Sequence, residues 1–125
     1  GCNLAMMAVA ADTSALEAER ISRARQAMKE ALAAINIQLP GVDSDFTDTE
    51  SRADPFDGSV TLFCHWRDKY GNLTGSLQIH ESGRIFAEYD VIQNHPEKAG
   101  WFIEAVSVWG DEDDLRSELR LIPLP

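Results

Sequence analysis

The chain has 125 residues, 44% of them hydrophobic, and a formal net charge of −10 at pH 7. This length suits a single domain, residues 1–125, with its own hydrophobic core, and the composition argues against disorder. Because the negative charge would repel phosphate groups, we expect neither a nucleic acid nor an anionic membrane surface as a partner.

Residues 1–12 are predicted to form an N-terminal tail. The tail opens with Gly1-Cys2 and continues as an apolar run that is too short to span a bilayer, so we expect no transmembrane segment. Gly-Cys resembles the acylation site of a bacterial lipoprotein, in which Cys2 would carry the lipid. A leader remnant, a tag glycine and a native start are the alternatives. Since Cys64 is the only other cysteine, no disulfide framework is expected, and a cytoplasmic location is the default.

A long amphipathic helix is predicted over residues 13–36. Ser14 and Glu17 have the spacing of a capping box, which satisfies the free amides of a first turn. Asn36 is the expected stop, because asparagine tolerates the left-handed conformation after a helix, and Pro40 follows. Apolar residues recur between these ends at steps of three and four, which places them on one helix face. This stripe comprises Ile21, Ala24, Met28, Leu32 and Ile35.

Two acidic runs account for most of the net charge. Residues 40–58 are predicted to form an acidic loop, since proline, glycine, serine and aspartate dominate this stretch. The second run occupies residues 111–114. One interpretation is that both runs are solvated loops. The other is that they form a pair of patches that steer a basic partner toward the protein.

Residues 59–125 are predicted to form an antiparallel sheet. Gly71 and Gly83 each stand fourth in a turn sequence, which is typical of a three-residue hairpin loop. Such a loop fixes the strand register. In the second hairpin it sets Leu77 opposite Ala87, and the whole of that face is apolar.

The first hairpin is predicted in the same way. Its turn sets Phe63 beside Leu77 and His65 beside Gly75, so these side chains would lie under the helix. Alternate residues then lie on the opposite face, which is a mixture of polar and apolar groups. This mixed face is predicted to carry Cys64, Trp66, Thr74, Glu88 and Asp90.

Residues 101–109 fit either a helix or a strand, and cross-strand pairing favours a strand. Folding this segment back on residues 115–122 sets Ile103 opposite Leu121. The predicted fold class is therefore α+β, with one N-terminal amphipathic helix packed on a five-stranded antiparallel meander sheet. The same register also predicts the pairs Ala105–Leu119, Trp109–Leu115 and Glu104–Arg120.

The sequence contains no GxGxxG, Walker, HExxH or GxSxG motif. Cys64 and His65 are neighbours on a strand, so they point to opposite faces and cannot share a proton. The predicted registers also place His65 and His80 on opposite faces, which excludes a shared metal ion. Glu88 and Asp90 share one face, and we interpret the pair as polar sheet surface. We expect no catalytic residue, no cofactor and no metal.

The sequence favours a non-enzymatic protein-binding domain, most consistent with a bacterial origin. The predicted binding residues are Trp66, Thr74, Glu88 and Asp90 on an acidic, tryptophan-containing surface. Aromatic groups beside carboxylates suit a protein partner with a basic surface, and we also consider a homodimer. Small acidic α+β proteins that act as secretion chaperones or toxin-neutralising immunity proteins have this size and charge. That analogy assigns no site residue.

Two alternatives belong to other classes of protein. A small-ligand-binding protein or enzyme would use a pocket between helix and sheet, lined by His65 and Tyr89. An envelope lipoprotein accessory factor would be lipid-anchored in the cell envelope through Cys2.

Overall fold

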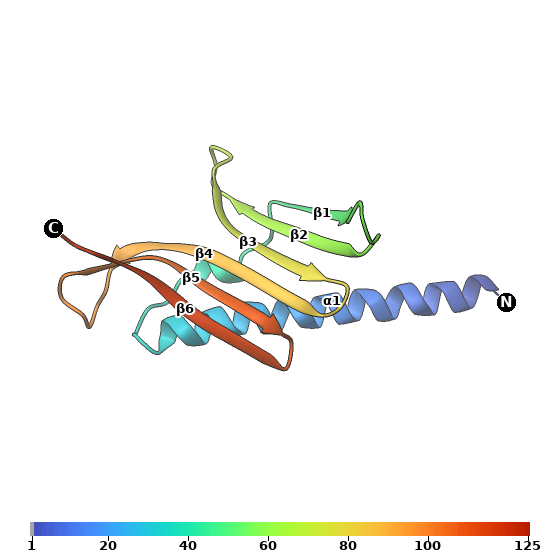
Figure 1. Cartoon of the computed structure of the whole chain (residues 1–125), viewed down its shortest axis with the longest axis horizontal. Coiled ribbons are helices and arrows are strands. Elements are labelled where there is room, and N and C mark those ends of the chain that lie inside the picture. The colour runs from blue at the N-terminus through green and yellow to red at the C-terminus, as the bar shows by residue number, and fades with distance from the viewer. Residues whose placement is uncertain (1) are drawn as a thin grey trace.

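The computed structural model describes the backbone of residues 2–125 and the side chains of residues 15–125. One long helix, α1 (Cys2–Ala33), lies along one face of a six-stranded sheet, and a short 3-10 helix, η1 (Pro40–Asp43), follows it (Figure 1). Each strand pairs antiparallel with the next along the chain, so the sheet is a meander. The α+β class is confirmed, but the sheet has six strands, not five. The strands are β1 (Asp48–Ala53), β2 (Val60–Arg67), β3 (Leu73–His80), β4 (Arg84–Asn94), β5 (Trp101–Asp111) and β6 (Asp114–Pro123).

The end of α1 follows the prediction, whereas its start does not. α1 begins at Cys2 and runs through the expected tail and capping box. The side chains of residues 1–14 lie outside the described part, and so does the lipid-carrier interpretation of Cys2. Asn36 has a left-handed φ of 59°. The Ile37 N–H donates to the Leu32 carbonyl at 3.0 Å, which closes a Schellman motif with both side chains buried.

The predicted apolar stripe of α1 packs against the sheet and covers the hydrophobic core. Ala24, Met28 and Leu32 are fully buried, and Ile21 and Ile35 pack beside them. The spacing of the stripe therefore determined correctly which side of α1 meets the sheet. The sheet contributes Cys64, Trp66, Leu77, Ile79, Ile85, Ala87, Ile103, Val106 and Val108 to this core.

The register of the β3–β4 hairpin is confirmed, and that of the β2–β3 hairpin is wrong by one residue. Leu77 pairs with Ala87 as predicted. In β3, however, Thr74 is an extra residue at a β-bulge, so Trp66 pairs with Gly75 and Cys64 with Leu77. Because side chains alternate along a strand, a shift of one residue exchanges the two faces. Cys64 and Trp66 therefore lie in the core under α1, and Phe63 and His65 lie on the other face.

The acidic loop predicted over residues 40–58 contains a strand. β1 carries no apolar alternation, and each of its residues is exposed, so no periodic pattern marked it. Its pairing with β2 makes it one edge of the sheet. The prediction of a loop is therefore corrected for residues 48–53.

The strand assigned to residues 101–109 is confirmed by β5, and Ile103 does pair with Leu121. A bulge at Glu104 shifts the remaining register, so the predicted Ala105–Leu119, Trp109–Leu115 and Glu104–Arg120 pairs are wrong. Ala105 pairs with Arg120 and Trp109 with Arg116 instead. As a result Trp109 lies on the face of the sheet that α1 does not cover, which we call the open face.

Candidate protein-binding face

Aromatic side chains cross the open face in a single row. Phe63 on β2 pairs with Gln78, which pairs with Phe86 on β4, which pairs with Trp109 on β5. Phe86 and Trp109 are 40% and 36% exposed. Contiguous exposed apolar groups on a protein surface mark interaction sites more often than single ones do. We call Phe63, Phe86 and Trp109 the aromatic row.

Carboxylates gather on the same face farther along the strands, with Glu88 two residues and Asp90 four residues from Phe86. Glu88 and Asp90 lie on β4, and Glu104 lies at the bulge of β5. Burial raises the pKa of Asp90, and the charges of Glu88 and Glu104 raise it further, while Arg120 opposes them. The Arg120 guanidinium contacts Glu88 at 3.4 Å. These three carboxylates, the acidic cluster, therefore carry more negative charge than Arg120 neutralises.

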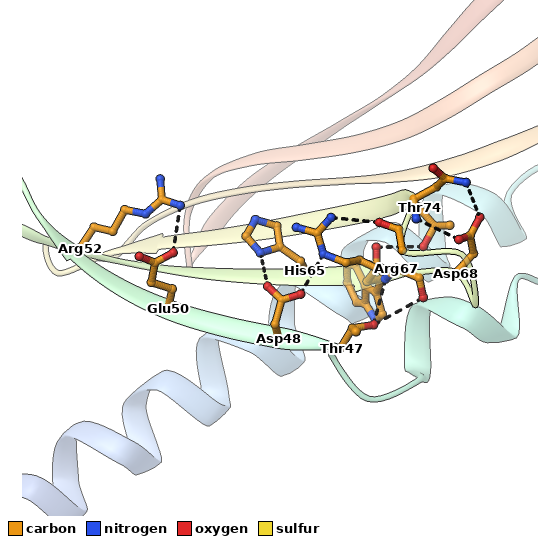
Figure 2. A network of polar contacts seen from close by, with 11 residues as sticks. Thr47, Asp48, Glu50, Arg52, His65, Arg67, Asp68 and Thr74 are labelled. Carbon is orange, nitrogen blue, oxygen red and sulfur yellow. Dashed lines mark hydrogen bonds and ion pairs between the residues drawn. The ribbon is translucent and has the colours of Figure 1, made fainter.

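A polar network holds β1 against β2 at the far side of the open face (Figure 2). The Asp48 carboxylate accepts hydrogen bonds from His65 Nδ1 at 2.7 Å and from Arg67 Nε at 2.9 Å. The Arg67 hydrogen bond lowers the pKa of Asp48 most, and the one from His65 adds to it. Arg52 also contacts Glu50 at 2.9 Å. These charge-assisted contacts order an edge strand that buries no apolar side chain.

The network places Asp48, His65 and Ser76 side by side across β1, β2 and β3. A serine nucleophile needs its base within about 2.6–3.2 Å. Within residues 15–125, His65 forms its hydrogen bond with Asp48 and none with Ser76. The row therefore lacks the contact that would activate the Ser76 hydroxyl.

Cys64 and His65 do point to opposite faces. The Cys64 side chain is fully buried. Burial raises the pKa of its thiol to about 11, with a smaller contribution from the charge of Glu17. The thiol therefore stays protonated at neutral pH, and the thiolate required for nucleophilic chemistry is scarce.

The four predicted binding residues do not come together. Glu88 and Asp90 lie on the open face as expected, but Trp66 is only 2% exposed and lies under α1. Its indole N–H donates to the Ser44 carbonyl at 3.0 Å, and its ring packs against Phe46. The Thr74 hydroxyl, at the bulge, donates to the Trp66 carbonyl at 3.1 Å. The bulge exchanges the two faces of β2, and this exchange separates Trp66 from Glu88 and Asp90.

The aromatic row was missed by the sequence analysis, although a signal for it exists. Val60, Leu62, Cys64 and Trp66 are apolar at every second position of β2, whereas the residues between them are polar except for Phe63. This pattern predicts that the first set faces the core. If this alternation is given more weight than the turn sequence at Gly71, Phe63 is predicted to lie on the open face. The bulge at Glu104 is not marked by glycine or another turn residue, so the sequence carries no comparable signal for the face on which Trp109 lies.

The expected ligand pocket between helix and sheet does not have its predicted lining. His65 lies on the open face, whereas Tyr89 lies under α1. The Tyr89 ring packs edge-on against Trp66 at 5.1 Å, and Met28 of α1 is fully buried in the same core. Side chains therefore fill the space around Tyr89, and the hollow that does lie between α1 and strands β1 to β3 is elsewhere, near Leu62.

Basic side chains of α1 form ion pairs with both acidic runs. Lys29 Nζ contacts Asp43 at 2.9 Å, next to the start of the first run. Arg20 contacts Glu112 at 3.8 Å and Arg23 contacts Asp113 at 3.7 Å in the second. Part of the negative charge in these runs is thus engaged within the molecule.

The histidines do not gather into a metal site. His65 and His80 both lie on the open face, contrary to the prediction, but their rows are four residues apart, roughly 13 Å at ~3.3 Å per residue. Among the described residues, no group of three or more metal-ligating side chains occurs. The helices described here include none that is long and apolar enough to cross a membrane.

Comparison with known proteins found no match among family models, curated proteins or solved structures.

Proposed function

We propose that this chain is a non-enzymatic protein-binding domain that uses its open face. The observation that carries the proposal is the aromatic row on the face that α1 leaves uncovered, in which Phe86 and Trp109 are exposed and Phe63 is partly exposed. Trp109 takes the place that the sequence analysis gave to Trp66. Exposed aromatic residues at the centre of a patch are the commonest sites of strong binding energy between proteins.

The acidic cluster specifies the kind of partner. Glu88 lies two residues from Phe86 along β4, and Asp90 and Glu104 lie farther along the same face. The raised pKa of Asp90 reflects partial burial and the repulsion among these carboxylates. A lysine or arginine of a partner would relieve this repulsion, whereas an acidic partner would increase it. The proposed partner is therefore a protein segment with basic and apolar side chains.

The setting of these side chains supports binding without large rearrangement. All three aromatic residues lie on strands, and the Asp48 network ties the outermost strand to its neighbour. Side chains held on regular elements lose less conformational entropy on binding than side chains on mobile loops. A chaperone-like or immunity-like adaptor, working in a reducing cytoplasm that keeps the buried Cys64 thiol free, would use such a surface.

The first test is affinity capture from the native host with three forms of the protein. The wild type is compared with a Phe86→Ala, Trp109→Ala double variant and with Tyr70→Ala as matched control, since Tyr70 is exposed in the β2–β3 turn, off the row. We expect one stoichiometric protein that the wild type and Tyr70→Ala retain and the double variant loses. Equal capture by all three forms would contradict the proposal.

The captured protein then allows a quantitative test. Titration calorimetry with the purified partner should give a dissociation constant raised about 30-fold or more by Trp109→Ala, as for hot-spot residues that contribute ~2 kcal/mol. A change below about threefold would remove Trp109 from the interface.

A further inference from the structure

β6 is an edge strand whose outer side is unpaired in the described part of the chain (Figure 1). It spans Asp114–Pro123, and its first five residues, 114–118, include only Leu115 as a partly buried side chain. Exposed edge strands are templates for a further strand unless charge, proline or a cover prevents it. The only proline of β6 is Pro123, at its end.

The β5–β6 hairpin determines which peptide groups of β6 face outward. Asp111 pairs with Asp114 across a two-residue turn, and residues that flank such a turn form a hydrogen-bonded pair. Bonded and non-bonded pairs then alternate along the strands. The N–H and C=O groups of Leu115, Ser117 and Leu119 therefore point away from β5, toward the free edge.

Leu115 and Leu119 lie two residues to either side of Ser117. The residues between them, Arg116 and Glu118, carry opposite charges. If two copies of β6 pair antiparallel with Ser117 on the two-fold axis, their outward peptide groups meet one another. Each cross-strand pair then occurs twice. The pairs are Leu115 with Leu119 of the second copy, Arg116 with Glu118 of the second copy, and Asp114 with Arg120 of the second copy.

Neighbouring registers are less favourable. An axis at Arg116 would set two arginines opposite each other, and an axis at Glu118 would do the same with two glutamates, which destabilises a sheet. An axis at Leu119 would place an outward peptide group of Leu115 opposite Pro123, which has no N–H to donate. Among these four axes, only Ser117 both sets opposite charges opposite each other and keeps Pro123 out of the pairs with outward peptide groups.

The other edge of the sheet is less suited to this pairing. β1 has six residues, all exposed, and includes no leucine. Its charged groups are already engaged, Glu50 with Arg52 and Asp48 with Arg67, each at 2.9 Å. Arg116 and Glu118 of β6 are exposed and, within residues 15–125, form no ion pair.

We propose that the partner of the β6 edge is a second copy of this chain, joined antiparallel about Ser117 into one continuous sheet. Residues directly opposite each other point to the same face of a sheet, so both α1 helices lie on one side and both open faces on the other. The dimer therefore leaves the aromatic rows free. This inference does not depend on what the open face binds.

Charge reversal tests the register. Sedimentation velocity over a concentration series should show a dimer for the wild type, and Arg116→Glu or Glu118→Arg should each raise the dimer dissociation constant about tenfold, because each sets like charges opposite twice. The Arg116→Glu, Glu118→Arg double variant restores opposite charges and should restore the wild-type constant. A monomeric wild type at every concentration, or a double variant no tighter than the single ones, would overturn the proposal.

Proline substitution tests which edge pairs. Ser117→Pro removes an outward N–H of β6 without removing a bond to β5, and Ser51→Pro makes the matched change on β1. We expect only Ser117→Pro to give a monomer, and circular dichroism shows whether each variant is folded. If Ser117→Pro does not fold, hydrogen exchange decides. Amides of Leu115, Ser117 and Leu119 should be protected in the wild type and lose protection on dilution; exchange independent of dilution would overturn the proposal.

Discussion

Trp66 and Trp109 both take their face of the sheet from a β-bulge, yet one is buried and the other is exposed. Trp66 is 2% exposed, packs against Phe46 and Tyr89, and joins the segment before β1 to the core. Trp109 is 36% exposed on the open face. In both cases the face is set by one extra residue, Thr74 on the strand paired with that of Trp66, and Glu104 five residues before Trp109 on the same strand. The residue type therefore does not decide whether a tryptophan is buried or exposed; the register does.

The largest expected effect is on the buried tryptophan. Trp66→Ala removes the ring that meets Phe46 and Tyr89 and the hydrogen bond to the Ser44 carbonyl. We expect the free energy of unfolding to fall by about 3–5 kcal/mol, as for large aromatic residues in cores. Denaturant unfolding measures it, and a loss below about 1 kcal/mol would show that Trp66 does not support the core.

The next largest effect on stability is expected at Gly75, which lies beneath the rings of Trp66 and Tyr89. A Cβ added at Gly75 would lie 2.6 Å from Tyr89 Cδ2 and 2.9 Å from the Glu88 carbonyl oxygen. The backbone oxygen cannot move aside as a side chain can, so Gly75→Ala should destabilise by about 1–3 kcal/mol through overpacking. The control is Gly41→Ala, where the close neighbour is the end of the Tyr89 side chain, and the same unfolding experiment should give a smaller loss.

The exposed tryptophan should matter little for stability. Trp109→Ala removes a side chain that is partly in solvent, and we expect about 1 kcal/mol or less. Thermal unfolding compared with Trp66→Ala checks this difference. Equal losses for the two variants would mean that the open face belongs to a covered core, and the binding proposal would lose its basis.

The smallest effects concern two carboxylates of the open face. The pKa of Asp48 is lowered in the folded state, so its stabilising contribution is present above the unfolded pKa and is lost as pH falls through the folded pKa. Asp48→Asn should therefore lower Tm at neutral pH and not in strong acid. The pKa of Asp90 is raised, so its ionised form opposes folding, and Asp90→Asn should raise Tm at neutral pH. Tm measured against pH with both variants tests the two signs together.

The sequence alone determined the elements whose signal is local. The stripe from Ile21 to Ile35 and the stop at Asn36 were readable because helical periodicity and left-handed capping depend on neighbouring residues. The β3–β4 register was readable for the same reason, since Gly83 defines the turn and both apolar sets alternate without interruption.

Only the tertiary structure decided which residues share the open face. β1 has no apolar pattern, and it is a strand because β2 and the Asp48 contacts hold it. The bulges at Thr74 and Glu104 each shift a register by one residue, and a strand with period two turns that shift into an exchange of faces. The packing of Trp66 and Tyr89 over Gly75 beneath α1 fixes the first shift, and that packing joins residues far apart in the sequence.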